Sequence, residues 1–222
     1  MWLILTACTD RLPAAAGPIP ARGLAIRVAP EVAAVGDPRF DGAPGRYAAN
    51  DEPWRWTEPQ RIAAAAYDLA DLVRRGAGER PPVVAWDGRG GGIRVGRPED
   101  FGLPSPFAPP TPTTREQHLV RTVADGALVL GVEAAGVELA AATLARELGY
   151  RWTLPGPAWE IVPRFDELPP IAVASDGPQL AARRITGPVS GADGLRYARW
   201  SRATNWWRST CALRVCACAR KT

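Results

Sequence analysis

The fold of this chain is decided by the stretch from Gln117 to Pro163, QHLVRTVADGALVLGVEAAGVELAAATLARELGYRWTLPGPAWEIVP. Two β-rich runs, 119–123 and 128–130, lie on either side of Asp125-Gly126, a turn dipeptide that tolerates positive φ. The pattern predicts a β-hairpin with one apolar face.

The spacing of apolar residues changes after the hairpin. From Gly136 they recur every three or four positions, which predicts a helix over 136–148 packed on the hairpin. Gly149 follows at the position where a left-handed residue ends a helix. Residues 150–163 combine aromatic residues with three prolines, which indicates an ordered segment without regular secondary structure.

A second helix is predicted over 57–76. Thr57-Glu58-Pro59-Gln60 has the form of a capping box with proline in the first turn, an apolar stripe follows, and Gly76 ends the helix. Asp68 and Asp71 are close enough on this helix to suggest paired carboxylates. Because arginines lie within a turn of them, we interpret both as part of a solvated helix face.

The remaining elements are short. Strands are predicted at 24–28, 82–86, 92–96 and 171–173, and surface loops at 30–53 and 98–114. The glycine cluster at 87–91 lacks the lysine and hydroxyl residue of a phosphate-binding loop and does not begin a helix, so we interpret it as a loop between strands. The chain therefore predicts an α+β fold, a mostly antiparallel or mixed sheet with two helices on one face.

The order of these elements resembles a known family. A hairpin, a helix of small residues, Leu-Gly, Arg-Trp, Pro-Gly and a proline-terminated strand are similar to the N-terminal α/β domain that precedes the catalytic barrel in bacterial alpha-glucuronidases, beta-hexosaminidases and related envelope proteins. The positions that carry the resemblance are Leu148, Gly149, Arg151, Trp152, Pro155, Gly156, Ile161, Val162 and Pro163. It covers 117–163 and is fainter back to Thr57.

Length and charge limit the domain organisation. A chain of 222 residues with 46% hydrophobic content can bury one core, but not a small domain plus a barrel of about 250 residues. We expect a signal remnant and tether at 1–22, the accessory domain at 23–175, and at 176–222 the start of a missing barrel with a truncated or frameshifted tail. Nine basic residues and one acid after residue 182 carry the positive charge, so it does not indicate nucleic-acid binding.

The N-terminus, MWLILTAC, has the pattern of a bacterial lipoprotein signal at its cleavage site, with Cys8 as the lipidated residue. The basic region and longer apolar core of a secretory signal are missing, which suggests a start further upstream. The alternative is a chance hydrophobic N-terminus. No stretch approaches the ~20 apolar residues that span a bilayer, so we expect membrane attachment only through a lipid anchor.

Candidate sugar-binding residues lie near the C-terminus. The resemblance implies an arginine at the entry to the barrel, where Arg183 and Arg184 stand, but the glycine and aspartate that should follow are missing. Trp206 and Trp207 suit a sugar-stacking platform and equally a barrel interior. The substrate-binding candidates are Arg184, Trp206 and Trp207.

Metal chemistry is not expected. Cys211, Cys216 and Cys218 have spacings that fit no common zinc pattern, since structural zinc sites favour Cys-x2-Cys pairs. The single histidine, His118, is far from them in the sequence, on a predicted strand beside the hairpin turn. We predict no metal and no other cofactor.

Catalysis is not expected from this chain either. A glycosidase needs a general acid and a second carboxylate about 5 to 10 Å apart, and the resemblance places these groups in the barrel. We therefore predict an inactive accessory domain of a glycoside hydrolase-like envelope protein, with carbohydrate as the partner of the parent protein. The alternative is a stand-alone envelope carbohydrate-binding or interaction module.

Overall fold

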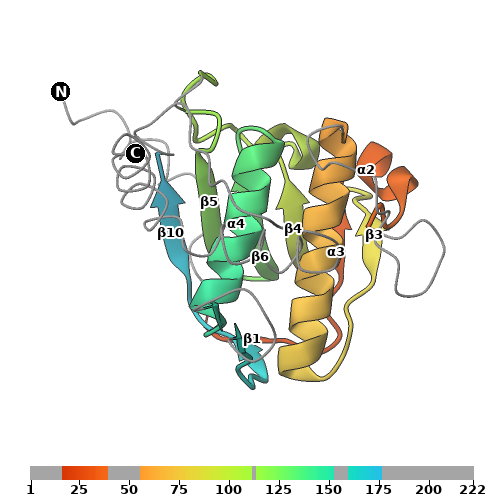
Figure 1. The fold of residues 1–222 in the computed structure, drawn as a ribbon, viewed down its shortest axis with the longest axis vertical. Helices are drawn as coiled ribbons and strands as arrows, with labels where there is room; N and C mark the ends of the chain where they lie inside the picture. Colours follow the sequence, from red (N-terminus) through yellow and green to blue (C-terminus); the bar gives the residue numbers. More distant parts are fainter. Residues whose placement is uncertain (1–16, 40–55, 112–113, 153–159, 177–222) are drawn as a thin grey trace, which may run out of the picture.

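A six-stranded mixed sheet forms the centre of the computed structural model, which describes residues 17–39, 56–111, 114–152 and 160–176 (Figure 1). The strand order is β10-β5-β6-β4-β2-β3. The strands span β2 Ile26–Val28, β3 Val83–Ala85, β4 Gly92–Gly96, β5 His118–Val123, β6 Gly126–Gly131 and β10 Ala172–Ser175. β5 pairs antiparallel with both β10 and β6, and the pairs from β6 to β3 are parallel. The predicted mixed sheet is confirmed.

β5 and β6 form the predicted hairpin, with Val123 opposite Gly126. The two-residue loop is therefore Ala124-Asp125, one position before the predicted turn dipeptide. Gly126 is the first residue of β6, and this position requires glycine because a Cβ atom there would lie 1.9 Å from the carbonyl oxygen of Gly92. A side chain at this position would push β6 away from β4.

Two long helices cover one face of the sheet, as predicted (Figure 1). α3 spans Glu58–Ala77, and α4 spans Ala134–Glu147. Burial of apolar surface between helices and sheet, at roughly 25 cal/mol per Å², is the main favourable contribution to folding. The largest aliphatic side chains of this core include Ile26, Ile62, Leu69, Ile93, Val73, Val95 and Leu144.

α3 ends later than predicted. Gly76 lies inside the helix, and Gly78 with φ 88° is the left-handed residue that ends it. Gly76 has a packing role instead, because a Cβ atom there would lie 2.1 Å from Cε1 of Phe165. Glycine at this position lets the chain after β8 pass directly over the helix.

Several short elements were not predicted from the sequence. The helix α2, Pro30–Val35, lies in the predicted loop 30–53. β1, Ile19–Pro20, lies in the predicted tether and pairs with β9, Glu167–Leu168. β7, Arg151–Trp152, pairs with β8, Glu160–Ile161, in a segment predicted to lack regular structure.

The segment after β4 covers part of the other face of the sheet. It begins with the 3-10 helix η2, Pro98–Phe101. Phe101 is only 8% exposed and packs in a second apolar cluster with residues of β5 and β6, namely Leu119, Val123, Leu128 and Leu130. The prediction of 98–114 as a surface excursion is therefore wrong for its first residues, because they complete a core.

Tyr150 joins the end of α4 to α3. Gly149, just after α4, has a positive φ of 100°, and the side chain of the next residue, Tyr150, is fully buried. Its hydroxyl donates a hydrogen bond to the carbonyl oxygen of Leu72 in α3. Nearby, Arg75 donates two hydrogen bonds of 2.8 Å to the carboxylate of Glu160 in β8. Tyr150, just after α4, and Glu160 are therefore both attached to α3.

Tyr150→Phe is expected to lower the free energy of unfolding by about 1 kcal/mol, because it removes one buried hydrogen bond and keeps the ring. Chemical denaturation monitored by circular dichroism measures the change. Tyr67→Phe is the matched control, since the Tyr67 ring face contacts Arg39 and Arg80 and keeps these contacts as phenylalanine. Equal midpoints for wild type and Tyr150→Phe would contradict the structural role of this hydroxyl.

Candidate functional site

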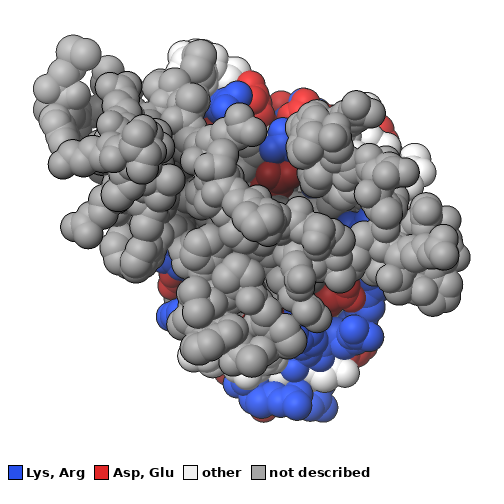
Figure 2. Space-filling view, viewed as in Figure 1, with Lys and Arg blue, Asp and Glu red and all other residues white. Residues whose placement is uncertain are grey.

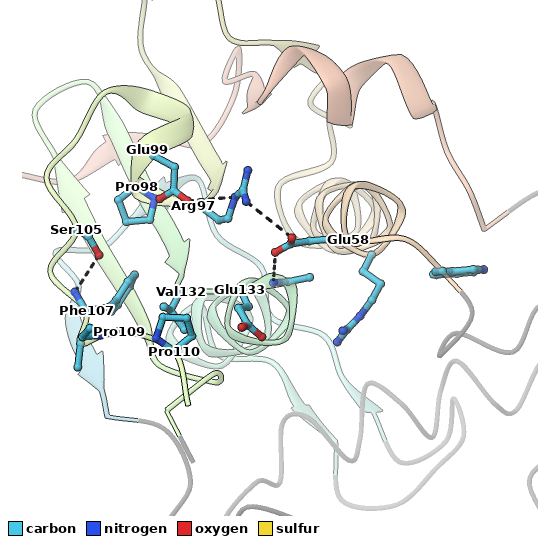
Figure 3. A pocket seen from close by; sticks show the side chains of 14 residues that line it. Glu58, Arg97, Pro98, Glu99, Ser105, Phe107, Pro109, Pro110, Val132 and Glu133 are labelled. Atoms are coloured by element: carbon cyan, nitrogen blue, oxygen red, sulfur yellow. Dashed lines mark hydrogen bonds and ion pairs between the residues drawn. The ribbon is translucent and has the colours of Figure 1, made fainter. Parts of the chain in front are cut away.

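A pocket of about 760 Å³ lies where α3 and α4 begin, beside η2 and the proline-rich segment after it (Figure 3). Its charged lining residues are Glu58, Arg61, Arg97, Glu99 and Glu133. Its apolar wall consists mainly of Phe107, Pro98, Pro109 and Pro110, with Trp56 on the side of α3. The volume falls in the range of about 300 to 1,000 Å³ that is common for small-molecule sites.

Arg97 links the acidic residues on one side of the pocket. Its guanidinium lies 3.1 Å from the carboxylate of Asp100, 3.5 Å from that of Glu99 and 3.8 Å from that of Glu58. Burial lowers the pKa of Arg97, but the hydrogen bond and charge of Asp100, with the charges of Glu58 and Glu99, outweigh this effect and leave the pKa raised. Arg97 is therefore a permanent cation held by carboxylates.

Glu58 connects the two helix starts. Its Oε1 accepts a hydrogen bond of 3.1 Å from the backbone N–H of Ala134, the first residue of α4. A carboxylate at this place satisfies one of the free N–H groups at a helix N-terminus and complements the helix dipole. Glu58 therefore positions α4 as well as lining the pocket.

Arg61 is engaged by α4. It donates hydrogen bonds of 3.1 and 3.0 Å to the two carboxylate oxygens of Glu138. Burial lowers the pKa of Arg61, but the hydrogen bond and charge of Glu138, with the charges of Glu58 and Glu116, outweigh this effect and leave the pKa raised. Figure 2 shows acidic and basic side chains together at the end of the molecule where both helices begin.

Asp68 and Asp71 are not on a solvated face, contrary to the prediction. Both contact the guanidinium of Arg39, at 3.4 and 3.0 Å, and Arg39 also binds Asp37 at 2.7 Å. Arg39 is 4% exposed. The two carboxylates therefore form an ion cluster that attaches the segment after α2 to α3, and they are not arranged as a catalytic pair.

His118 lies at the open end of the hairpin, opposite Gly131, and not beside the turn as predicted. Its Nδ1 is 3.0 Å from the carbonyl oxygen of Glu116, and its Nε2 is 3.1 Å from the hydroxyl of Thr143 in α4. Because a carbonyl oxygen only accepts, the neutral ring carries its proton on Nδ1. His118 is thus a buried structural residue between β5 and α4.

The domain is expected to become less stable as the pH decreases, because of the buried His118. Burial lowers the pKa of His118 below its ordinary value of 6.5, so the unfolded chain binds the proton more readily than the folded chain. The stabilisation is fully present above pH 6.5 and is lost as the pH falls through the folded pKa. His118→Gln is expected to flatten this dependence in urea denaturation measured across the range, and an unchanged slope would contradict it.

Several predicted residues lie outside the described residues: Cys8, Arg183, Arg184, Trp206, Trp207 and the C-terminal cysteines. Among residues that the structure describes, no group of three or more histidine, cysteine or acidic side chains is placed to hold a metal ion. Within the same residues, no helix has the length and hydropathy needed to cross a bilayer.

The pocket itself was not predicted. Its walls come from the start of α3, from 97–110 and from 132–134, and no motif joins these three segments in the sequence. Glu58 was singled out only as part of the capping box at the start of α3. The proline run in 98–114 was the one signal of an unusual surface, although proline alone does not indicate a binding site.

No protein-family model and no curated protein matches this chain. Among solved structures, it is similar to the GH20 beta-N-acetylhexosaminidase from Streptomyces coelicolor A3(2), with a TM-score of 0.34 and 23% sequence identity. It is also similar to a Streptomyces plicatus N-acetyl-beta-hexosaminidase, with a TM-score of 0.36 and 21% identity. These similarities cover 69% and 73% of this chain, and 23% of the length of each hexosaminidase chain.

Proposed function

We propose that this chain is the non-catalytic N-terminal accessory domain of a carbohydrate-active, glycoside hydrolase-like envelope protein that takes part in polysaccharide metabolism. The observation that carries the proposal is the location of the residues that resemble that family. Those that the structure describes lie just after α4, at 148, 149, 151 and 152, and in and after β8, at 161–163.

The contacts of this segment suit a structural module. Gly149 adopts a positive φ, and a Cβ atom there would lie 3.2 Å from Pro163. Glu160, just before Ile161, is held by Arg75 of α3. Among the resembling residues, the buried Leu148 and the positive-φ Gly149 therefore have a structural role at the end of α4.

The described carboxylates also favour a non-catalytic role. Glu138 accepts two hydrogen bonds from Arg61, so both of its carboxylate oxygens are engaged within the protein. Asp166 lies on the surface, 85% exposed, with Arg22 at 3.5 Å. Neither carboxylate has the environment of a glycosidase acid.

A stand-alone carbohydrate-binding or interaction module is the second candidate function. The pocket at the helix starts favours it, because its combination of an apolar wall and several charged groups is typical of ligand sites. The coding DNA beyond residue 222 distinguishes the two candidates: several hundred further codons with βα periodicity would support the accessory domain, and a stop codon would support the stand-alone module.

The purified 222-residue chain is expected to hydrolyse no aryl glycoside above background, including glucuronide and N-acetylglucosaminide substrates. Without a positioned acid and a nucleophile, it forgoes the 10² to 10⁴-fold that proton transfer contributes, among other effects. Release of the aryl group, followed by absorbance, is the measurement. Turnover that a single substitution at Glu138 or Asp166 abolishes would overturn the proposal.

The envelope location is also a proposal and depends on Cys8. A form that starts at its upstream initiation codon is expected to sediment with membranes, and Cys8→Ser is expected to release it to the soluble fraction. One acyl chain binds membranes only marginally, so stable anchoring requires multiple acylation at this residue. Recovery of the unsubstituted form in the soluble fraction would contradict the anchor.

A further inference from the structure

The pocket at the helix starts contains more carboxylates than guanidinium groups. Its lining residues and their direct ion-pair partners include Arg61 and Arg97 as cations, and Glu58, Glu99, Asp100, Glu133 and Glu138 as anions. Five carboxylates against two guanidiniums leave a net charge of −3. An interior with this balance attracts a cation and repels a carboxylate or phosphate.

The individual pairs show which carboxylates are already engaged. Glu138 holds Arg61, and Asp100 holds Arg97 with a side chain that is 4% exposed. Glu58 accepts a hydrogen bond from the backbone N–H of Ala134, so a carboxylate of the protein already lies at the positive N-terminus of α4. Both guanidiniums thus have their counter-ions, and the lining keeps an excess of negative charge.

Glu133 is the carboxylate most available to a ligand. It is the N-cap residue of α4, yet its side chain makes no capping hydrogen bond, and no other described residue forms a hydrogen bond or an ion pair with its carboxylate. Its carboxylate is half-buried and lines the pocket together with Glu58 (Figure 3). An ammonium group near Glu133 would gain charge-assisted hydrogen bonds.

The opposite wall provides an apolar surface for the body of the ligand. Phe107, Pro109 and Pro110 line the side of the pocket away from the helix starts (Figure 3). Aromatic faces attract cations and pack against the apolar faces of rings. A ligand with a protonated amine on a compact ring would therefore satisfy both walls at once.

We propose that this pocket binds a sugar that carries a free, protonated amino group, with the amine at Glu133 and Glu58 and the ring against Phe107. The choice of a sugar as the body of the ligand rests on the proposed carbohydrate function, whereas the requirement for an amine rests on the charges of the pocket alone. N-acetylation removes the positive charge, so the acetylated sugar is a poor ligand.

Calorimetric titration of the 222-residue chain tests the proposal with three probes: a β-1,4-linked glucosamine dimer, its N-acetylated counterpart and 1,5-diaminopentane. The glucosamine dimer is expected to bind, and the N-acetylated dimer to bind at least about tenfold more weakly, since a charged hydrogen bond is lost. Glu133→Gln is expected to weaken glucosamine binding by about tenfold. Glu147→Gln, the same change at the exposed other end of α4, is expected to leave it unchanged.

Other outcomes would overturn the proposal. Equal binding of both dimers would show that the pocket does not require the amine. Binding of the diamine without binding of the glucosamine dimer would show that the ligand is not an amino sugar. Equal effects of the two substitutions, with both variants folded by circular dichroism, would place the ligand elsewhere, and no binding of any probe would reject the site. None of these results changes the expected outcome of the glycoside hydrolysis assay, so the proposed function is tested separately.

Discussion

The architecture depends on the close approach of α4 to the end of β6, which two glycines permit. A Cβ atom on Gly131 would lie 2.1 Å from the backbone nitrogen of Val137, and one on Gly136 would lie 2.3 Å from the carbonyl oxygen of Gln117. Any larger residue at either place would move the helix off the sheet. The position of α4 in turn sets where Glu133 and Ala134 meet α3, and therefore where the pocket forms.

Local signals predicted the long elements well. The run 92–96 has the predicted bounds, and α3 and α4 begin and end within about two residues of the predictions because an apolar stripe on a helix is a strong signal. The elements that were missed are two to six residues long. β1 and β9 pair across most of the chain, and a pairing that depends on tertiary contacts leaves almost no local pattern.

The candidate site was harder to predict than the fold. Sequence analysis interpreted Asp68 and Asp71 as part of a solvated helix face, whereas in the structure both pair with the buried Arg39. It placed His118 beside the hairpin turn, whereas His118 lies at the other end of the hairpin and contacts Thr143. Glu133 carried no signal, since a lone glutamate before a helix is common. Glu133 becomes a candidate ligand-binding residue only because the fold brings it into one pocket with Glu58 and Arg97.

The strand order has a consequence for the growing chain. β10, Ala172–Ser175, lies at one edge of the six-stranded sheet and pairs with β5. It is also the last strand of this sheet in the sequence, so it is synthesised last. Before they are added, β5 is itself the edge, and its unpaired backbone groups and apolar side chains form a template on which another chain can add a strand. The nascent domain is therefore most open to intermolecular pairing in the interval between synthesis of the hairpin and synthesis of β10.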